Sequence, residues 1–124
     1  HELHHCTEYQ YWHTMNYEWE EWTEANRQDF QYKGGGAFAY EQPEIDWYTF
    51  SRHSEGFINL YSTTAQEEDR SEIVAAIMSE LDRKQLEELL KEDHILQQKV
   101  LLIKILLSEV SRTENNYWNQ VFDW

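Results

Sequence analysis

The sequence is poor in cysteine, in basic residues and in long apolar stretches, and each shortage excludes a class of protein. A single cysteine, Cys6, excludes an intramolecular disulfide framework and any metal site built from several cysteines. The longest apolar stretch, Val100 to Leu107, is interrupted by Lys104 and is far shorter than the roughly 20 residues that span a bilayer. We therefore expect no membrane span and no disulfide-stabilised fold.

Basic residues are scarce beside acidic ones. Lysine and arginine number 10, and aspartate and glutamate number 24, which gives a formal net charge of −14. An acidic surface repels phosphate groups, so we expect neither nucleic acid nor an anionic membrane as a partner. The aromatic content of 15%, with 6 tryptophans and 8 tyrosines, supplies apolar surface for a core and argues against disorder.

The chain divides into an aromatic half and an aliphatic half. Aromatic residues are frequent up to Tyr61 and absent from residues 62–116. We expect the first half to be rich in loops, notably around the three glycines at 34–36, and the second half to be helical. We predict one domain over residues 1–124. Because the sequence opens at His1 without a methionine, we also expect it to be the C-terminal portion of a longer domain.

Apolar spacing predicts a mainly α-helical fold. Thr64 and Glu67 have the spacing of a capping box, in which each side chain bonds a backbone amide at a helix start. Alternation on both sides of the glycines favours a small β-hairpin near residues 30–40. The last helix is apolar on most faces, so we expect it to be the central buried one. Helices are predicted over residues 1–12 and 17–25, over 64–81, from Asp82 as its cap through Leu90, and from Ile95 to about Val110 with Asp93 as its cap.

The first five residues, His-Glu-Leu-His-His, form an H-E-x-x-H motif. His1 and His5 are four residues apart, so on a helix both imidazoles lie on one face, about 6 Å apart, and can bind one zinc ion. Glu2 lies about 100° further round the helix, where it can take a proton from a water molecule that the ion activates. The alternative is an exposed helix that is merely rich in histidine.

A catalytic zinc ion needs a third protein ligand, and two glutamates are candidates. The metzincin pattern is excluded, because Glu8 and Tyr11 stand where it requires glycine and histidine. Glu24 follows His5 by 19 residues, the spacing of aminopeptidase-type gluzincins, but it lies among other acids typical of a solvated helix face. Glu68 opens the next predicted helix and is the stronger candidate, and both alternatives stay open at this stage.

A segment further along the chain resembles part of a zinc peptidase family. Residues 56–61 have the pattern Gly-Phe-x-x-x-Tyr, and residues 68–72 have the pattern Glu-Asp-x-x-Glu. This resembles the second active-site segment of lethal-factor-type and Pro-Pro-endopeptidase-type zinc peptidases and of related bacterial metallopeptidases. The resemblance implies the helical part of a zincin-like domain, with its upstream sheet missing from this sequence.

The resemblance also implies one zinc ion and a role for each candidate side chain. A tyrosine hydroxyl can stabilise the oxyanion of peptide hydrolysis, and a carboxylate next to a ligand imidazole can fix its tautomer. The implied roles are zinc ligand for His1, His5 and Glu68, general base for Glu2, oxyanion stabilisation for Tyr61, and hydrogen bonding to a ligand imidazole for Glu72.

The function that follows is a zinc-dependent endopeptidase of the gluzincin kind, acting on a peptide or protein substrate. One alternative is a non-catalytic binding or structural module of the same fold, and another is an acidic inhibitor that binds a basic partner. A copper site would need a free amino terminus at His1. Among the remaining side chains we expect His4 to be exposed, Cys6 to be buried, and His53 and His94 to be structural or exposed.

Overall fold

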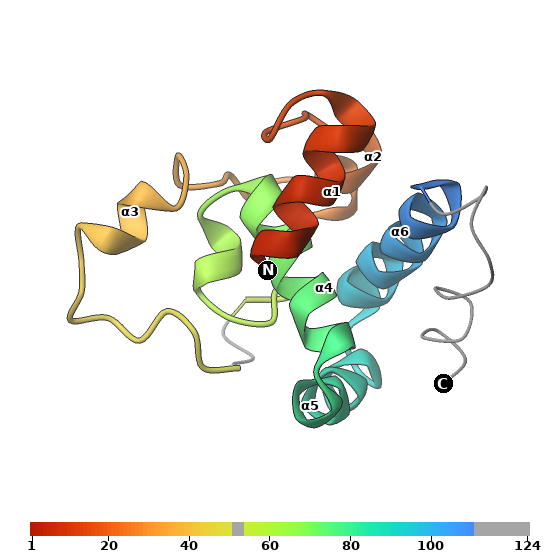
Figure 1. The fold of residues 1–124 in the computed structure, drawn as a ribbon. Coiled ribbons are helices and arrows are strands. Elements are labelled where there is room, and N and C mark those ends of the chain that lie inside the picture. Colours follow the sequence, from red (N-terminus) through yellow and green to blue (C-terminus); the bar gives the residue numbers. More distant parts are fainter. Residues whose placement is uncertain (51–53, 111–124) are drawn as a thin grey trace.

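The computed structural model of the chain describes residues 1–50 and 54–110. The prediction of a mainly helical chain is confirmed, and these residues contain no β-strand. None of the helices in this part of the chain is long and apolar enough to cross a membrane. In chain order the elements are α1 (Glu2–Trp12), α2 (Glu20–Ala25), α3 (Ala37–Tyr40), the short 3₁₀ helix η1 (Tyr61–Thr63), α4 (Gln66–Met78), α5 (Glu80–Leu90) and α6 (His94–Val110) (Figure 1).

Helix α4 is the element around which the others pack. It contacts η1, α1, α5 and α6 (Figure 1). Its apolar side chains Ile73 and Ile77 are fully buried against Leu96 and Ile103 of α6 and Trp22 of α2. Burial of such side chains is the main source of stability in a domain of this size.

The expectation that the last helix is the central buried one holds for only part of α6. Leu96 and Ile103 are fully buried, but Leu101 and Ile105 on the same helix are about half exposed. The helix therefore covers one side of the core. The helix at the centre of the packing is α4.

A buried ion pair joins α4 to α6. Lys99 Nζ lies 2.8 Å from Asp69 Oδ2, and neither side chain is exposed. The same carboxylate oxygen accepts hydrogen bonds from the Tyr32 hydroxyl at 2.8 Å and from Trp22 Nε1 at 3.1 Å. Because a buried charge is tolerated only when it is paired and hydrogen-bonded, this cluster fixes how α4 and α6 meet.

The predicted β-hairpin near residues 30–40 is wrong. The backbone amide of Lys33 donates to Thr63 O at 3.1 Å, and that of Gly35 donates to Thr64 O at 2.7 Å. The segment therefore pairs with the chain around η1 instead of folding back on itself. Gly34 and Gly35 have φ values of 97° and 116°, which favour glycine, and the residues after them form α3. Figure 1 shows this segment extending to one side of the other helices.

The predicted capping box at the start of α4 is also wrong. The Thr64 hydroxyl donates to Tyr61 O at 2.7 Å, because the chain makes a 3₁₀ turn immediately before the helix. Ala65 is the N-cap, and no side chain caps the helix. The Glu67 carboxylate is therefore not used for capping.

The sequence predicts the start of α6 correctly but not the start of α5. The helix predicted over 64–81 ends at Met78, and Ser79 starts α5 by accepting a hydrogen bond from the Asp82 amide at 3.4 Å. The prediction that Asp82 caps α5 is therefore wrong. The cap before α6 is confirmed, since Asp93 Oδ1 accepts from the Leu96 amide at 2.9 Å.

Candidate metal centre

Helices α1 and α4 cross so that both histidines of the H-E-x-x-H motif meet Glu68. His1 Nε2 lies 2.8 Å from Glu68 Oε2, His5 Nε2 lies 3.3 Å from Glu68 Oε1, and the two Nε2 atoms are 3.1 Å apart. In a tetrahedral zinc site with bonds of about 2.0–2.2 Å, the ligand atoms lie about 3.3–3.6 Å from one another. The His5–Glu68 separation matches that geometry, whereas the two separations that involve His1 are shorter than it.

The Glu68 carboxylate has an oxygen that hydrogen bonding does not satisfy. Its Oε2 atom is buried and has no hydrogen-bond partner among residues 1–50 and 54–110, although His1 Nε2 is only 2.8 Å away. The two atoms form an ion-pair contact, which raises the pKa of His1. A carboxylate oxygen beside two imidazole nitrogens fits the donor set of zinc, which binds histidine nitrogen and carboxylate oxygen.

The outer nitrogen of each imidazole is held by the next turn of α4. His1 Nδ1 lies 3.3 Å from Glu72 Oε2, and His5 Nδ1 lies 3.2 Å from the Ser71 hydroxyl. Asn59 Nδ2 in turn donates to Glu72 Oε1 at 3.4 Å. Contacts at Nδ1 hold both rings with their Nε2 atoms next to Glu68 and to each other, and such contacts are typical of metal-ligating histidines.

The electrostatics of this cluster favour a cation. The Glu68 carboxylate, with help from Glu72, raises the pKa of His1 to about 10. Glu68 also raises the pKa of His5. Burial raises the pKa of Glu68, but the two imidazoles outweigh it, so this pKa lies well below the usual range. The site attracts positive charge, which protons or a metal ion can supply.

Glu2 lies beside this donor set but is much more open to solvent than Glu68. Its Oε1 atom is 3.6 Å from His1 Nε2, and His1, Glu2 and His5 each place a ligand atom within 4.8 Å of the others. The Glu2 side chain is 89% exposed, whereas that of Glu68 is 14% exposed. Glu68 is the less exposed of the two carboxylates and contacts both imidazoles, whereas Glu2 is open to water.

Tyr61 lies on the other side of Glu68. Its ring is buried and lies 5.8 Å from the His1 ring. Burial and the nearby Glu68 charge raise the pKa of this phenol above its ordinary value. The hydroxyl therefore keeps its proton and remains a hydrogen-bond donor.

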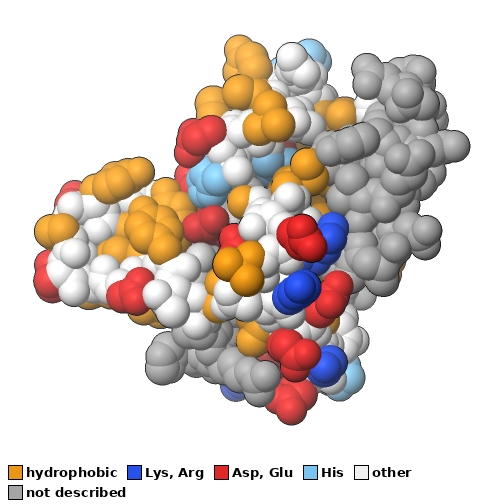
Figure 2. All heavy atoms as spheres, turned by 60° about the horizontal axis from the view of Figure 1, so that its bottom comes forward, with side chains coloured by type: hydrophobic (Ala, Val, Ile, Leu, Met, Phe, Trp, Pro, Cys, Tyr) orange, Lys and Arg blue, Asp and Glu red, His pale blue; other side chains and the backbone are white. Residues whose placement is uncertain are grey.

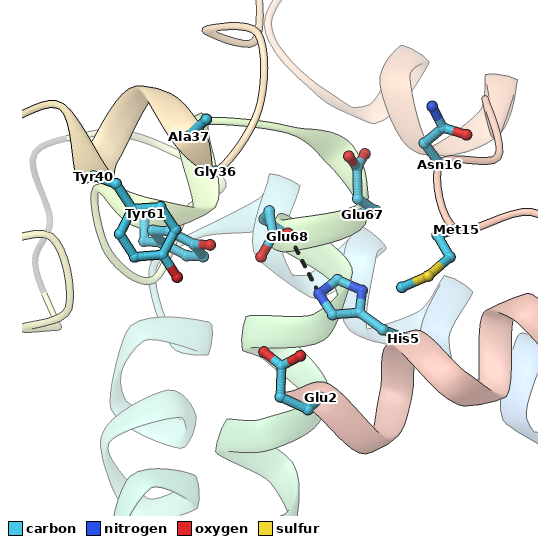
Figure 3. A pocket seen from close by; sticks show the side chains of 10 residues that line it. All are labelled: Glu2, His5, Met15, Asn16, Gly36, Ala37, Tyr40, Tyr61, Glu67 and Glu68. Carbon is cyan, nitrogen blue, oxygen red and sulfur yellow. Dashed lines mark ion pairs between the residues drawn. The ribbon is translucent and has the colours of Figure 1, made fainter.

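The donor set opens into a cleft of about 550 Å³. Figure 3 shows that its walls come from α1, from the turn at Met15 and Asn16, from the segment between Gly36 and Tyr40, and from the start of α4. Figure 2 shows histidine side chains at the surface beside acidic and apolar ones. A cleft at a metal-ligand set is where a substrate is expected to bind.

Gly36 brings one wall of the cleft close to the candidate centre. A Cβ atom at this position would lie 2.6 Å from the Tyr61 hydroxyl oxygen and 3.7 Å from the Glu68 carboxyl carbon. A side chain here would displace the tyrosine. This role of the third glycine is not visible in the sequence, where the glycines indicate only a flexible break.

The alternative third ligand, Glu24, is not part of this site. It lies exposed on α2 and is not among the residues that line the cleft. The structure thus places together five of the predicted site residues on α1 and α4, with Tyr61 beside them. These residues are His1, Glu2, His5, Glu68 and Glu72.

A second polar cluster on the same pair of helices was not expected. His4, predicted to be exposed, is buried, and its Nε2 lies 2.7 Å from Glu8 Oε2. Arg70 holds the Glu8 carboxylate with two hydrogen bonds of 2.7 and 2.9 Å. The face of α1 toward α4 carries residues 1, 4, 5 and 8, so Cys6 points away and is exposed, contrary to its predicted burial.

The spacing His-x-x-His-His-x-x-Glu was the available signal for this face, because residues at i, i+3, i+4 and i+7 share one side of a helix. Ser71 had no comparable signal. His94 is exposed, in line with its prediction, and His53 lies outside the described residues. A comparison with known protein families, characterised proteins and solved structures finds no match to this chain.

Proposed function

We propose that this chain is a zinc-dependent endopeptidase in which His1, His5 and Glu68 hold the metal. The observation that carries the proposal is the convergence of two Nε2 atoms and one carboxylate within 2.8–3.3 Å of one another. Their outer contacts from α4 support it, because a pair of histidines held at Nδ1 is set up for ligation at Nε2.

The other residues of the cleft have roles that suit peptide hydrolysis. When bound, a zinc ion supplies Lewis acidity, which polarises a peptide carbonyl and makes a water molecule more acidic. The exposed Glu2 carboxylate, 3.6 Å from His1 Nε2, accepts the proton of the attacking water. The Tyr61 hydroxyl donates to the carbonyl oxygen as negative charge develops on it.

Metal content and peptide hydrolysis test this proposal together. The purified protein, dialysed against trace zinc, is analysed for metal and assayed with a mixed library of quenched fluorescent peptides. We expect one zinc ion per chain and hydrolysis that a chelator abolishes and zinc restores. Glu2→Gln should keep the zinc and lose hydrolysis, because the amide has the same shape but cannot accept a proton. Glu24→Gln, on the exposed face of α2, is the matched control and should change neither.

Three results would contradict the proposal. Absence of stoichiometric zinc would remove the ligand set. Zinc without hydrolysis of any library member would favour the alternative, a non-catalytic module of the same fold. Full hydrolysis by Glu2→Gln would show that another group accepts the proton.

A further inference from the structure

The cleft contains one carboxylate that neither the metal site nor the helix start uses. Glu67 precedes the ligand Glu68 on the first turn of α4, lines the cleft and is partly buried. It has no hydrogen-bond or ion-pair partner within the described ranges 1–50 and 54–110. The capping role expected from the sequence is absent, because the Thr64 hydroxyl bonds Tyr61 O instead.

The cations nearest in the fold are occupied elsewhere. Arg70, one turn further on α4, is fully buried on Glu8. Lys33, from the glycine segment, places its Nζ 6.0 Å from the Phe38 ring centre and 5.7 Å from that of Trp47. No lysine or arginine is among the ten described residues that line the cleft.

The walls around Glu67 suit a long aliphatic side chain with a charged end. Figure 3 shows Glu67 between Ala37 on one side and Met15 with Asn16 on the other. The methylene groups of a lysine or arginine can pack against such walls while the cationic group reaches a carboxylate. An ion pair in a partly closed cleft is stronger than one on an open surface.

We infer that Glu67 selects substrates with a lysine or arginine side chain next to the scissile bond. The inference rests on the proposed peptidase function, since it assigns the substrate class of the same cleft. Glu68 is engaged by the two imidazoles and Glu2 by the proton transfer, so Glu67 is the carboxylate left to bind a cationic side chain.

The test uses peptides that differ at one position only. Quenched fluorescent libraries carry lysine, norleucine or glutamate at a fixed position, with all other positions randomised. The same libraries, singly labelled, are titrated against the zinc-loaded Glu2→Gln variant, which binds without cleaving. We expect lysine to be preferred over norleucine by about tenfold in both kcat/KM and affinity, the typical contribution of one charge-assisted hydrogen bond. Glutamate should be the poorest.

Three variants isolate Glu67. Glu67→Gln should abolish the lysine preference, and Glu67→Lys should reverse it so that the glutamate library becomes the best. Glu24→Gln removes an equal charge from the exposed face of α2 and should leave the preference intact. Zinc content and thermal unfolding of each variant are measured alongside. Zinc content should not change, since the carboxylate that contacts the two imidazoles is that of Glu68. Thermal unfolding should change only slightly, because Glu67 is an acid in the first turn of α4.

The outcomes separate the two proposals. Equal use of the lysine and norleucine libraries, or a lysine preference that survives Glu67→Lys, would overturn the inference and leave the peptidase intact. A Glu67-dependent lysine preference in binding, without hydrolysis by the zinc-loaded wild type, would support the inference and overturn the catalytic function.

Discussion

Two histidine–carboxylate clusters join α1 to α4, and they differ in how deeply they are buried. In the closed cluster, His4 and Arg70 both hold Glu8, and the side chains of all three are at most 1% exposed. In the open cluster, His1 and His5 converge on Glu68 and border a cleft. The two clusters lie on the same helix pair and use the same residue types.

The two clusters use the same residue types, and they differ in the cation that the carboxylate meets: an arginine in the closed cluster and only imidazoles in the open one. Both oxygens of Glu8 accept hydrogen bonds from Arg70 at 2.7 and 2.9 Å, so the charge is neutralised within the protein. Glu68 Oε2 is buried with no hydrogen-bond partner in the described residues, lies 2.8 Å from His1 Nε2 in an ion pair, and has two imidazole nitrogens 3.1 Å apart beside it. In the first arrangement an arginine neutralises the carboxylate, although His4 Nδ1 has no hydrogen-bond partner among the described residues, whereas in the second only imidazoles contact the carboxylate.

Breaking the closed cluster should have the largest effect. Arg70→Met leaves the Glu8 carboxylate buried beside His4 alone, and loss of one partner of a buried ion pair typically costs about 3–5 kcal/mol. Urea unfolding followed by circular dichroism should show a loss of this size. The double variant Glu8→Leu/Arg70→Met should recover much of it, because no unpaired charge remains. A single-variant loss under about 1 kcal/mol would show that the closed cluster is not structural.

Breaking the open cluster should lower the zinc affinity far more than it lowers the free energy of unfolding. Glu68→Gln removes the carboxylate that contacts both imidazoles, so we expect zinc affinity to fall about 100-fold or more. Competition with a fluorescent zinc chelator measures the change, and the free energy of unfolding of the metal-free protein should fall less than in Arg70→Met. Glu24→Gln should leave the affinity unchanged. If only Glu24→Gln loses zinc, the third ligand is Glu24 on α2 and not Glu68.

The sequence predicted the parts of the site that depend on one helix. The spacing of His1 and His5 places both on one face of any helix, whatever packs against it. The helix carrying Glu68 was predicted from its apolar spacing, but its position beside α1 came only from the resemblance. The order of helices and the Asp93 cap before α6 were likewise local signals.

The features that the sequence did not predict depend on contacts between distant segments. Which face of α1 is buried follows from where α4 crosses it, so His4 and Cys6 were assigned to the wrong sides. The hairpin was wrong because the amides of the glycine segment bond carbonyls near η1. Ser71 contacts His5 across 66 residues of sequence, and a serine carries no pattern that indicates such a partner.

Removing that serine should have a moderate effect on the open cluster. Ser71→Ala deletes the hydroxyl 3.2 Å from His5 Nδ1, which leaves the ring less well oriented for ligation. We expect zinc affinity to fall about tenfold, at the lower end for changes around a metal ligand. Ser108→Ala, on the exposed side of α6, is the matched control. Equal zinc affinity in both variants would show that packing alone orients His5.

The smallest effect, and the sharpest contrast between the clusters, concerns alkaline pH. The pKa of His1 is raised to about 10, by Glu68 first and Glu72 second, from an ordinary value of 6.5. A raised pKa stabilises the metal-free fold fully below pH 6.5, and this contribution is lost as the pH rises toward 10. For Glu8, burial raises the pKa, but His4 and Arg70 lower it by more, so the net pKa lies below its ordinary value. The stability that this carboxylate contributes to the fold is therefore lost only in acid.

The melting temperature of chelator-treated protein should therefore fall between pH 6.5 and about 9.5, and that of zinc-loaded protein should fall less. The reason is that a ligated imidazole has already lost its Nε2 proton, so raising the pH removes nothing further from it. His1→Asn serves as the control, since it should flatten the profile of the chelator-treated protein without changing the acid limb that Glu8 contributes. Parallel profiles with and without zinc would show that His1 is not a ligand, and the open cluster would then be a second structural ion pair like the closed one.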